Sequence, residues 1–458
     1  MQYRPLNVAS WNVMSWNTLV NKISNQAGSV GSWLGRHKFD ILCLQETKVS
    51  IESLATDPKF FIPGYDLYSA PNRSSHCKGN GVATLVNRAT APEVEGVDFA
   101  PFGIPDLDSE GRCLVTLHVG GLAMINVYVP NDRNPTRLPH KMFFLNEITN
   151  LLFRLKQARR RVVLLGDFNI IHRPADVYWQ RRLININILS SGSEILKNRV
   201  PAKIESDVRQ LLPSVIPYKV ENSTYQFLNQ WSLHFDPNAA LKHNTWIDHI
   251  FWTESEAKVA LSLDETVAEG HVYKEKDRIP AFVLFDLLEK KLSIKFTEKE
   301  QKQVAETFGE ACGSPASVRW LDETCEKFRL VDVHAKFHGK AKDRFTVWDM
   351  MRKDRNVNRG FRLDFILVDY EIPVTLGGPL PLVSHEAEAA EDCAIQTDPD
   401  FEFSSPVRTG FTYTPVCYSD HIPITAVIDP RPIGETVETE YTLKCKNMFK
   451  LVAVEANC

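Results

Sequence analysis

Short apolar runs rich in Val, Ile and Leu recur along the chain, and turn-forming residues border most of them. Runs of this length are typical of β-strands, and they predict strands at residues 6–11, 40–45, 81–86, 112–119, 122–129, 161–166, 362–368 and 423–428. A helical period of apolar residues predicts helices at residues 16–37, 141–160, 297–311 and 318–328. Because helices intervene irregularly among the strands, we expect an α/β protein with mixed or antiparallel sheets and helices packed outside them.

Two stretches interrupt this alternation. Residues from about 178 to 294 are polar and rich in Asn, contain several prolines and carry no recognisable site motif. Residues 384–405 carry seven acidic side chains and no Lys or Arg, which is typical of a solvated loop. We therefore expect one catalytic domain over residues 1–429, interrupted by an insertion at about 178–294 and an acidic loop at 384–405. A C-terminal tail would follow at residues 430–458.

Six short polar motifs lie at the ends of predicted strands, where each places a carboxylate, carboxamide or imidazole. They are Ser10-Trp11-Asn12, Leu44-Gln45-Glu46-Thr47, Tyr128-Val129-Pro130-Asn131, Gly166-Asp167-Phe168-Asn169, Arg362-Leu363-Asp364 and Ser419-Asp420-His421. Their number suggests one polar site assembled from strand ends across a packed sheet. Oxygen ligands for a hard metal ion, together with one histidine, fit the hydrolysis of a phosphate ester.

Two of these motifs carry the acid–base and metal chemistry. Asp167 and Asn169 are two residues apart, so an extended backbone would project both to one face while Phe168 anchors the other. A carboxylate beside a carboxamide can orient and deprotonate a water molecule. Glu46 ends a buried strand and is a candidate Mg²⁺ ligand. Taken singly, Glu46 would more often be a surface residue beyond a strand, whereas Gly166-Asp167 fits a simple turn as well as it fits a site.

The histidine motif precedes the last predicted strand. Asp420 and His421 are adjacent, so they share a site only if the backbone turns there. A protonated His421 could bind a phosphate oxygen if a second carboxylate raised its pKa, and Asp364 is the natural partner. Asn12 and Asn131 each close a strand, where an amide can support a ligand or donate to an oxyanion. A lone His421 would otherwise be a structural histidine.

The composition is that of an ordinary globular protein. Of 458 residues, 43% are hydrophobic and 24% are charged, which supports a sizeable core. A net charge of −4 means that a polyanion must be held by a local basic face or by metal ions. Nine cysteines without a Cys-x-x-Cys pair argue against a zinc site and suit a reducing compartment. With a strand predicted from Leu6 and no apolar run near the ~20 residues of a membrane span, we expect a soluble intracellular enzyme.

Joined in this order, the motifs resemble the exonuclease III family of apurinic/apyrimidinic (AP) endonucleases, within the wider endonuclease/exonuclease/phosphatase superfamily. The first family signature is matched by residues 40–48, and the third by residues 358–367, with a departure at Asp369, where the family usually has Ser. The resemblance covers about residues 1–177 and 295–429. A similar run at residues 245–250 lacks the Asn-x-Gly-x-Arg that precedes Asp364, so we reject its Asp248 as the partner of His421.

Other segments resemble the second eukaryotic subgroup of this family most closely; they are residues 107–112, 125–128, 166–174 and 345–348. The resemblance implies a four-layer α/β sandwich with two facing sheets. It also implies Mg²⁺-dependent cleavage of DNA 5′ to an abasic site, with Mn²⁺ as the alternative ion. Removal of 3′-blocking groups and 3′→5′ exonuclease action would accompany that cleavage.

The resemblance implies a role for each of the strand-end residues. Glu46 and Asp420 would hold the metal ion, with Asn12 close by. Asp167 would activate or orient the water together with Asn169.

The phosphate would have its own partners in this scheme. Asn131 and Tyr128 would contact the phosphate, and His421 paired with Asp364 would stabilise the developing charge. These implied roles agree with those reasoned from the residue types, apart from that of Tyr128.

The resemblance also implies a substrate pocket. Phe361, Leu363 and Trp348 would line a pocket for a flipped abasic sugar, since aromatic faces favour an extrahelical nucleotide.

Met14 stands where the family usually has Asn or Asp, two residues after Asn12. We therefore expect weaker Mg²⁺ affinity or a changed metal preference.

Two other functions fit parts of the pattern. A superfamily phosphatase or lipid phosphodiesterase would keep Glu46, Asp167 and His421 but should lack the run that ends at Asp364. A non-catalytic DNA-binding relative is favoured only by Met14. The preferred hypothesis is a monomeric DNA-repair nuclease that acts on double-stranded DNA with abasic sites or 3′ ends and has no membrane contact. We expect a nuclear location, with mitochondria as the alternative, although no basic signal stands out.

Overall fold

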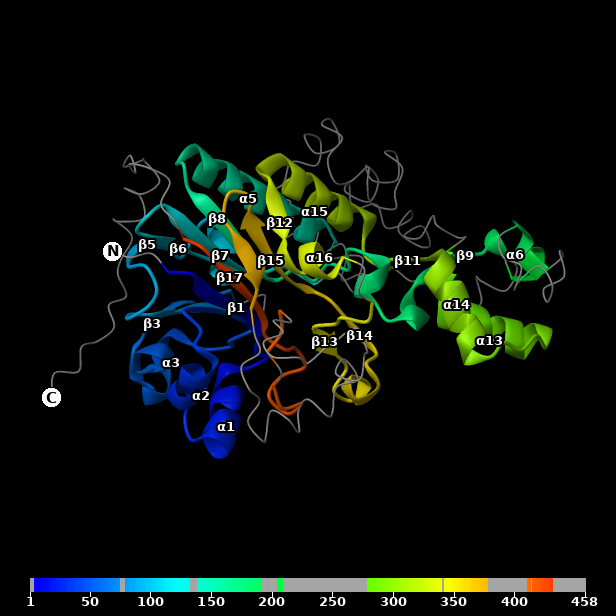
Figure 1. Cartoon of the computed structure of the whole chain (residues 1–458), viewed down its shortest axis with the longest axis horizontal. Coiled ribbons are helices and arrows are strands. Elements are labelled where there is room, and N and C mark those ends of the chain that lie inside the picture. Colours follow the sequence, from blue (N-terminus) through cyan, green and yellow to red (C-terminus); the bar gives the residue numbers. More distant parts are fainter. Residues whose placement is uncertain are drawn as a thin grey trace.

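A computed structural model describes residues 4–74, 79–131, 138–191, 196, 204–208, 278–339, 342–377, 410–412 and 414–430. Within these ranges, two six-stranded sheets face each other and helices cover the outer side of each sheet (Figure 1). This arrangement confirms the predicted four-layer α/β sandwich. None of the helices in these ranges is long and apolar enough to cross a membrane.

The first sheet has the strand order β16-β17-β1-β2-β4-β3. Only β1 and β2 are parallel, and the other neighbours are antiparallel, so the sheet is mixed as predicted. Its strands are β1 (Leu6–Asn12), β2 (Ile41–Gln45), β3 (Tyr65–Ala70), β4 (Val82–Asn87), β16 (Val374–Leu376) and β17 (Ile424–Ile428).

The second sheet has the order β12-β15-β8-β7-β6-β5 and is also mixed, with β7 and β8 as its parallel pair. Its strands are β5 (Val94–Asp98), β6 (Cys113–His118), β7 (Leu122–Tyr128), β8 (Arg161–Asp167), β12 (Leu330–Asp332) and β15 (Asp364–Asp369). Of the strands in these two sheets, the sequence pattern missed β3, β5, β12 and β16, because these strands are short or contain many polar residues.

Apolar side chains of both sheets fill the space between them. Val8 and Ile41 come from the first sheet, and Met124, Leu165 and Ile366 come from the second. Helices α1 (Trp16–Ala27) and α2 (Val30–His37) pack on the outer face of the first sheet, and α5 (Leu138–Gln157) and α15 (Pro315–Phe328) pack on that of the second. The smaller helices are α3 (Ile51–Thr56), α4 (Pro105–Ser109), α6 (Ile188–Ser191) and α16 (Val333–His338).

The prediction of a single helix over residues 16–37 is wrong. Gly28 has φ +85° and ends α1, and Ser29 is extended and caps α2 by accepting a hydrogen bond from the backbone N–H of Ser32. Glycine adopts positive φ without strain and serine is a favoured N-cap, so this pair breaks an otherwise continuous apolar stripe.

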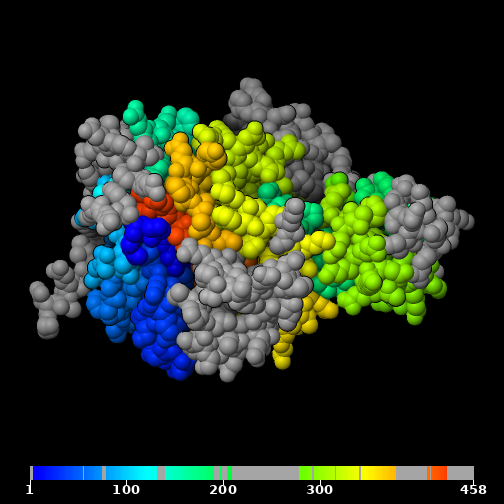
Figure 2. Space-filling view, in the orientation of Figure 1, coloured from blue at the N-terminus to red at the C-terminus, as the bar shows by residue number. Residues whose placement is uncertain are grey.

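A small lobe projects from one side of the two sheets (Figures 1 and 2). Its three-stranded sheet consists of β10 (Arg278–Pro280), β9 (Leu183–Asn185) and β11 (Gly309–Glu310), and its helices include α13 (Ala281–Leu292) and α14 (Glu298–Phe308). Ile184, Phe285 and Val304 belong to its own apolar core. That residues at about 178–294 are an insertion in the catalytic domain remains a prediction. The acidic loop at 384–405, the tail beyond residue 430 and Asp248 lie outside the described residues.

Candidate active site

In the second sheet, the register of three adjacent strands brings together polar residues from three motifs. Tyr128 at the end of β7 pairs with Asp167 at the end of β8, because the two strands are parallel. Asp364 begins β15, which is antiparallel to β8, and it pairs with Asp167 from the other side. Directly opposed residues lie about 5 Å apart, so the three side chains share one edge of the sheet.

The first sheet contributes residues to the same edge. Asn12 at the end of β1 is in register with Gln45 at the end of β2. Glu46 follows with φ +52°, so the chain turns as soon as the strand ends. His421 lies just before β17, and its backbone oxygen accepts a hydrogen bond from the Trp11 indole at 3.0 Å.

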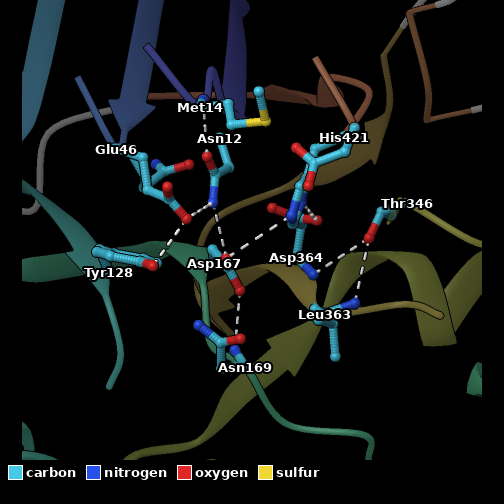
Figure 3. Close-up of polar contacts among 12 residues, drawn as sticks. Asn12, Met14, Glu46, Tyr128, Asp167, Asn169, Thr346, Leu363, Asp364 and His421 are labelled. Carbon is cyan, nitrogen blue, oxygen red and sulfur yellow. Dashed lines mark hydrogen bonds and ion pairs between the residues drawn. The ribbon is translucent and has the colours of Figure 1, made fainter. Parts of the chain in front are cut away.

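Hydrogen bonds join the polar residues of the two sheets (Figure 3). The Asn12 amide Nδ2 donates to Glu46 Oε1 at 3.0 Å and to Asp167 Oδ2 at 2.9 Å. The Tyr128 hydroxyl donates to the same Glu46 oxygen at 2.7 Å. Asn12 thus positions a carboxylate from each sheet and fixes the separation of Glu46 from Asp167.

Asn169 lies beside Asp167, but the route differs from the predicted extended backbone. Strand β8 ends at Asp167, and Asn169 has φ +50°, so a turn brings the two residues together. The Asn169 N–H donates to Asp167 Oδ1 at 2.9 Å, while its side-chain Nδ2 donates to the Val129 backbone oxygen at 3.0 Å. The buried Lys141 ammonium donates to the Asn169 backbone oxygen at 2.6 Å and holds the turn in place.

The backbone turn that His421 requires is made by Ser419. The Ser419 hydroxyl donates to the Asn12 backbone oxygen at 2.7 Å and accepts the His421 N–H at 3.2 Å. The imidazole Nδ1 of His421 then donates to Asp364 Oδ2 at 2.8 Å, and its Nε2 lies 3.9 Å from Asp167 Oδ2. The sequence-predicted pair of His421 with Asp364 is therefore present in the structure.

Burial and charge set the protonation of these groups. Burial alone would lower the pKa of His421, but the Asp364 carboxylate, with Asp420 and Asp167 nearby, raises it to about 10. At neutral pH the imidazole is therefore a cation. Burial also raises the pKa of Asp167 above its ordinary value, and the His421 charge only partly offsets this rise. A carboxyl group poised in this way suits a general base.

Glu46 behaves differently because its partners favour the charged form. Burial would raise the pKa of Glu46, but hydrogen bonds from Asn12 and Tyr128 and the nearby Lys48 ammonium hold it below its ordinary value. Lys48 Nζ lies 3.0 Å from Glu46 Oε2. Glu46 is therefore a carboxylate at neutral pH, available to a cation.

The residues at this edge fit a hard divalent ion by the chemistry of their donor atoms. Glu46 and Asp420 offer carboxylate oxygens and Asn12 a carboxamide oxygen, which is the ligand type that Mg²⁺ prefers. Ligand atoms of Asp167, Asp364 and His421 also lie within 4.8 Å of one another. Since a cationic imidazole offers no lone pair at Nε2, that second group suits a metal ion less well.

A groove of about 1290 Å³ opens at this edge of the sheets. Its lining includes all three residues of the predicted substrate pocket and four others of the site; these are Trp348, Phe361, Leu363, Met14, Asn131, Asn169 and Asp420. The short antiparallel strands β13 (Val347–Trp348) and β14 (Gly360–Phe361) carry the two aromatic residues. The Trp348 indole donates to Asn358 Oδ1 at 3.1 Å, which fixes the ring against this wall.

Several supporting residues escaped the sequence-based prediction. Thr346 accepts hydrogen bonds from the backbone N–H groups of Leu363 and Asp364 at its hydroxyl oxygen, at 3.1 and 3.4 Å (Figure 3). Gln45 Nε2 donates across the sheets to Asn126 Oδ1 at 2.9 Å, and both side chains are fully buried. Residue type alone gave no signal for either contact, because each joins segments far apart in the chain.

A buried ionic cluster lies behind Tyr128. Glu110 pairs with Arg112, and His140 Nε2 lies 3.1 Å from Glu110 Oε1. The Arg112 guanidinium lies 4.9 Å from the centroid of the Tyr128 ring and donates to the Tyr128 backbone oxygen at 3.2 Å. The cluster therefore positions the tyrosine that binds Glu46.

Replacing Glu110 with Gln should lower the free energy of unfolding in a pH-dependent manner. Burial would raise the pKa of Glu110, but His140 and Arg112 lower it from 4.5 to about 2. A depressed pKa stabilises the fold above pH 4.5, and this stabilisation is lost as the pH falls towards 2. We expect a loss of about 3 kcal/mol at pH 7, measured by urea unfolding, with a smaller difference between the proteins at pH 3.

The exposed ion pair of Asp66 with Arg88 provides the matched control. Asp66→Asn should change the free energy of unfolding by no more than about 1 kcal/mol. A difference between wild type and Glu110→Gln that stays the same from pH 7 to pH 3 would contradict the assigned ionisation.

Comparisons with known proteins agree with this geometry. The model of the Endonuclease/Exonuclease/phosphatase family matches residues 14–269. The human DNA-(apurinic or apyrimidinic site) endonuclease 2 is 34% identical over 212 residues, which cover 38% of this chain and 40% of that protein. The chain thus spans about two fifths of the length of the endonuclease 2 relatives that it matches.

A bacterial protein and a solved structure extend the comparison. The exodeoxyribonuclease of Bacillus subtilis is 26% identical over 173 residues, which cover 38% of this chain and 62% of that protein. The crystal structure of the AP endonuclease LMAP from Leishmania major superposes with a TM-score of 0.50 at 16% identity, covering 93% of this chain and 88% of that one. This structural similarity supports the fold.

Proposed function

The chain belongs to the endonuclease/exonuclease/phosphatase family, and from this premise we propose that it is a DNA-repair nuclease. It would hydrolyse the phosphodiester 5′ to abasic sites, with 3′-phosphodiesterase and 3′→5′ exonuclease activity. One observation carries the proposal: Asp167 Oδ2 lies 3.9 Å from Nε2 of a cationic His421, and their neighbours Asn169 and Asp420 line a groove that also contains aromatic side chains. The names of the endonuclease 2 and exodeoxyribonuclease relatives support DNA as the substrate.

The proposed cofactor is Mg²⁺, with Mn²⁺ as the alternative. Glu46 and Asp420 would hold the ion, with Asn12 close by. When bound, the ion supplies positive charge to the phosphate oxygens and to the leaving oxygen. Lys48, which pairs with Glu46 at 3.0 Å, would share that carboxylate or move away from it.

Asp167 is the proposed general base. A water molecule near Asp167 would lose its proton to the carboxylate as its oxygen bonds to phosphorus. The bond from phosphorus to the 3′ oxygen would break, and the departing 3′ oxygen would take up a proton from solvent water to give a 3′-hydroxyl. Asn12 and the Asn169 N–H hold the two carboxylate oxygens at 2.9 Å each, so the base is fixed before the substrate arrives. Fixing reacting groups in this way supplies part of the rate enhancement.

The remaining residues act on the phosphate. His421 would donate from Nε2 to a non-bridging oxygen, where its charge stabilises the negative charge that develops. Asp364 holds the opposite ring nitrogen at 2.8 Å and so fixes the orientation of the imidazole. Tyr128 and Asn131 would contact the same phosphate. The wall of Trp348, Phe361 and Leu363 would receive the flipped abasic sugar.

The deciding experiment compares an abasic duplex with a duplex that has a 3′-recessed end, each in Mg²⁺ and in Mn²⁺. We expect a nick 5′ to the abasic site and shortening of the recessed end. An abasic duplex left intact together with an unprocessed 3′ end would refute the proposal. Faster release of phosphate from phosphoinositides than nicking of DNA would instead favour a lipid phosphodiesterase.

Met14 provides a test of the metal site. Its φ is +58°, and its N–H donates to Asn12 Oδ1 at 3.0 Å, so its side chain stands beside the proposed ligands (Figure 3). Aspartate tolerates this backbone conformation and would add a carboxylate oxygen. We expect Met14→Asp to bind Mg²⁺ several-fold more tightly by calorimetry and to need less Mg²⁺ for half-maximal nicking.

The matched control for this substitution is Met14→Leu, which keeps the size and adds no ligand. It should need as much Mg²⁺ as the parent. If Met14→Asp also needs as much, the side chain at position 14 does not reach the metal.

We propose the domain organisation that the sequence predicted. Residues 1–429 would form one catalytic domain with an insertion at about 178–294, and the protein would act as a monomer on double-stranded DNA. We propose the nucleus as its location, with mitochondria as the alternative.

A further inference from the structure

The groove at the active site continues onto the small lobe. Besides Asn169 and Asp420, its lining includes Tyr178, Arg181 and Phe282. The last two belong to the lobe itself, where Arg181 ends a 3₁₀ turn at Trp179–Arg181 and Phe282 lies in the first turn of α13. A molecule bound at the catalytic edge can therefore extend along the lobe without leaving the groove.

This wall consists of two pairs of an arginine and an aromatic ring. The Arg181 guanidinium lies 5.7 Å from the centroid of the Phe282 ring, and the Arg359 guanidinium lies 5.7 Å from that of the Tyr178 ring. Phe282 is 44% exposed, which is unusual for a phenylalanine in a lobe with its own apolar core. We call Tyr178, Arg181, Phe282 and Arg359 the lobe wall.

Glu310, Asp349, Asp354 and Asp420 also line the groove, so the availability of the two lobe-wall arginines depends on which groove arginines these carboxylates pair with. Two other groove arginines are paired: Arg278 lies 3.0 Å from Glu310, and Arg352 lies 3.7 Å from Asp349. Within the described part of the chain, no such ion pair is formed by Arg181 or Arg359. Both guanidinium groups therefore remain available to an anion in the groove.

An exposed aromatic face beside an available guanidinium matches the chemistry of unpaired nucleotides. Their phosphates attract arginine, and their bases stack on aromatic and guanidinium planes without regard to sequence. A duplex offers only phosphates to such a wall, because its base faces are covered by neighbouring bases. An acidic peptide would use the arginines but has no base to stack on Phe282.

We propose that the lobe wall binds an unpaired stretch of the DNA strand whose neighbouring phosphate lies at Asp167. This inference rests on the proposed nuclease function and adds a substrate class to it. The enzyme would favour DNA in which single-stranded nucleotides adjoin the site of cleavage. The lobe would thereby extend the substrate contacts beyond the catalytic edge.

Binding measurements without metal test the proposal independently of cleavage. The full chain in EDTA is titrated into a fluorescent blunt duplex and into the same duplex with about ten unpaired nucleotides on either strand. We expect the extension to tighten binding to wild type. Phe282→Leu should lose about fivefold or more of that gain, since stacking of one base contributes about 1–3 kcal/mol.

Arg181→Gln separates phosphate binding from stacking. The slope of log affinity against log salt concentration should become shallower by about 0.7 for the extended DNA, because one phosphate is no longer neutralised by the guanidinium. Phe282→Leu should leave that slope unchanged. The blunt duplex should bind Phe282→Leu as it binds wild type, because its base faces are not available to the ring.

An arginine–aromatic pair outside the groove provides the control. Arg329 lies 4.7 Å from the Tyr370 ring, which is 64% exposed, so Arg329→Gln and Tyr370→Leu change the same chemistry elsewhere. These variants should bind extended DNA normally. No gain from the extension in wild type, or equal losses in the lobe-wall and control variants, would overturn the proposal. Wild type that binds extended DNA but neither nicks an abasic duplex nor shortens a 3′-recessed end would refute the nuclease function alone.

Discussion

Asp167→Asn should lower the rate of phosphodiester hydrolysis by about 10³- to 10⁴-fold, the contribution of a positioned general base. The amide cannot accept the proton of the attacking water. Its nitrogen, placed at the position of Oδ2, would also face the Asn12 amide that now donates to Asp167 at 2.9 Å. Two donors would then meet where a donor and an acceptor meet in the wild type.

Single-turnover cleavage of an abasic duplex at saturating enzyme is the appropriate measurement, because it separates chemistry from product release. Affinity for the uncleaved duplex should change by less than tenfold, since Asp167 acts on the water. Asp322→Asn, at an exposed carboxylate that pairs with His172, should cleave at the wild-type rate. A single-turnover rate for Asp167→Asn within tenfold of wild type would rule out Asp167 as the base.

The location of the candidate active site was predictable from the sequence because each motif lies at one end of an apolar run. Strand register then decides which of these residues meet. Asp364 and Tyr128 flank Asp167 because β15 and β7 flank β8. The pairing of His421 with Asp364 was predictable from charge, since a buried imidazole cation needs a carboxylate.

Other contacts could not be derived from local patterns. The backbone of Asn169 turns away from the strand with φ +50°, which an alternating pattern does not encode. Ser419 holds the turn before His421 through the backbone oxygen of Asn12, a residue more than 400 positions away. The Gln45–Asn126 contact at 2.9 Å requires that two sheets face each other, and no single strand carries that information.

The contacts of the small lobe could not be predicted from the sequence either. Residues 178–294 carry no recognisable site motif, so the sequence predicted them only as an insertion. Arg181 and Phe282 are separated by about a hundred residues, and only the packing of the 3₁₀ turn near α13 makes them a pair. The binding that we propose at this wall depends on side chains that are individually ordinary in the sequence.

Replacing Arg362 with Gln should be the most destabilising single substitution among those considered. The side chain is fully buried and binds Asp176 through two hydrogen bonds, at 2.8 and 3.0 Å, and Asp332 at 2.9 Å. Without the guanidinium, two carboxylates face each other without the cation that they share. Removing one partner from a buried ion pair costs about 3–5 kcal/mol, and we expect the free energy of unfolding to fall by that amount.

The same substitution should also impair catalysis, because Arg362 lies two residues before Asp364 and anchors the start of β15. Urea unfolding measures the loss of stability, and the single-turnover rate below the unfolding transition measures the displacement of Asp364. Arg362→Lys should rescue little, since an ammonium cannot make the two parallel hydrogen bonds to Asp176. Arg88→Gln removes an exposed partner of Asp66 and should cost about 1 kcal/mol or less. Equal losses for Arg362→Gln and Arg88→Gln would show that the buried network does not hold this strand in place.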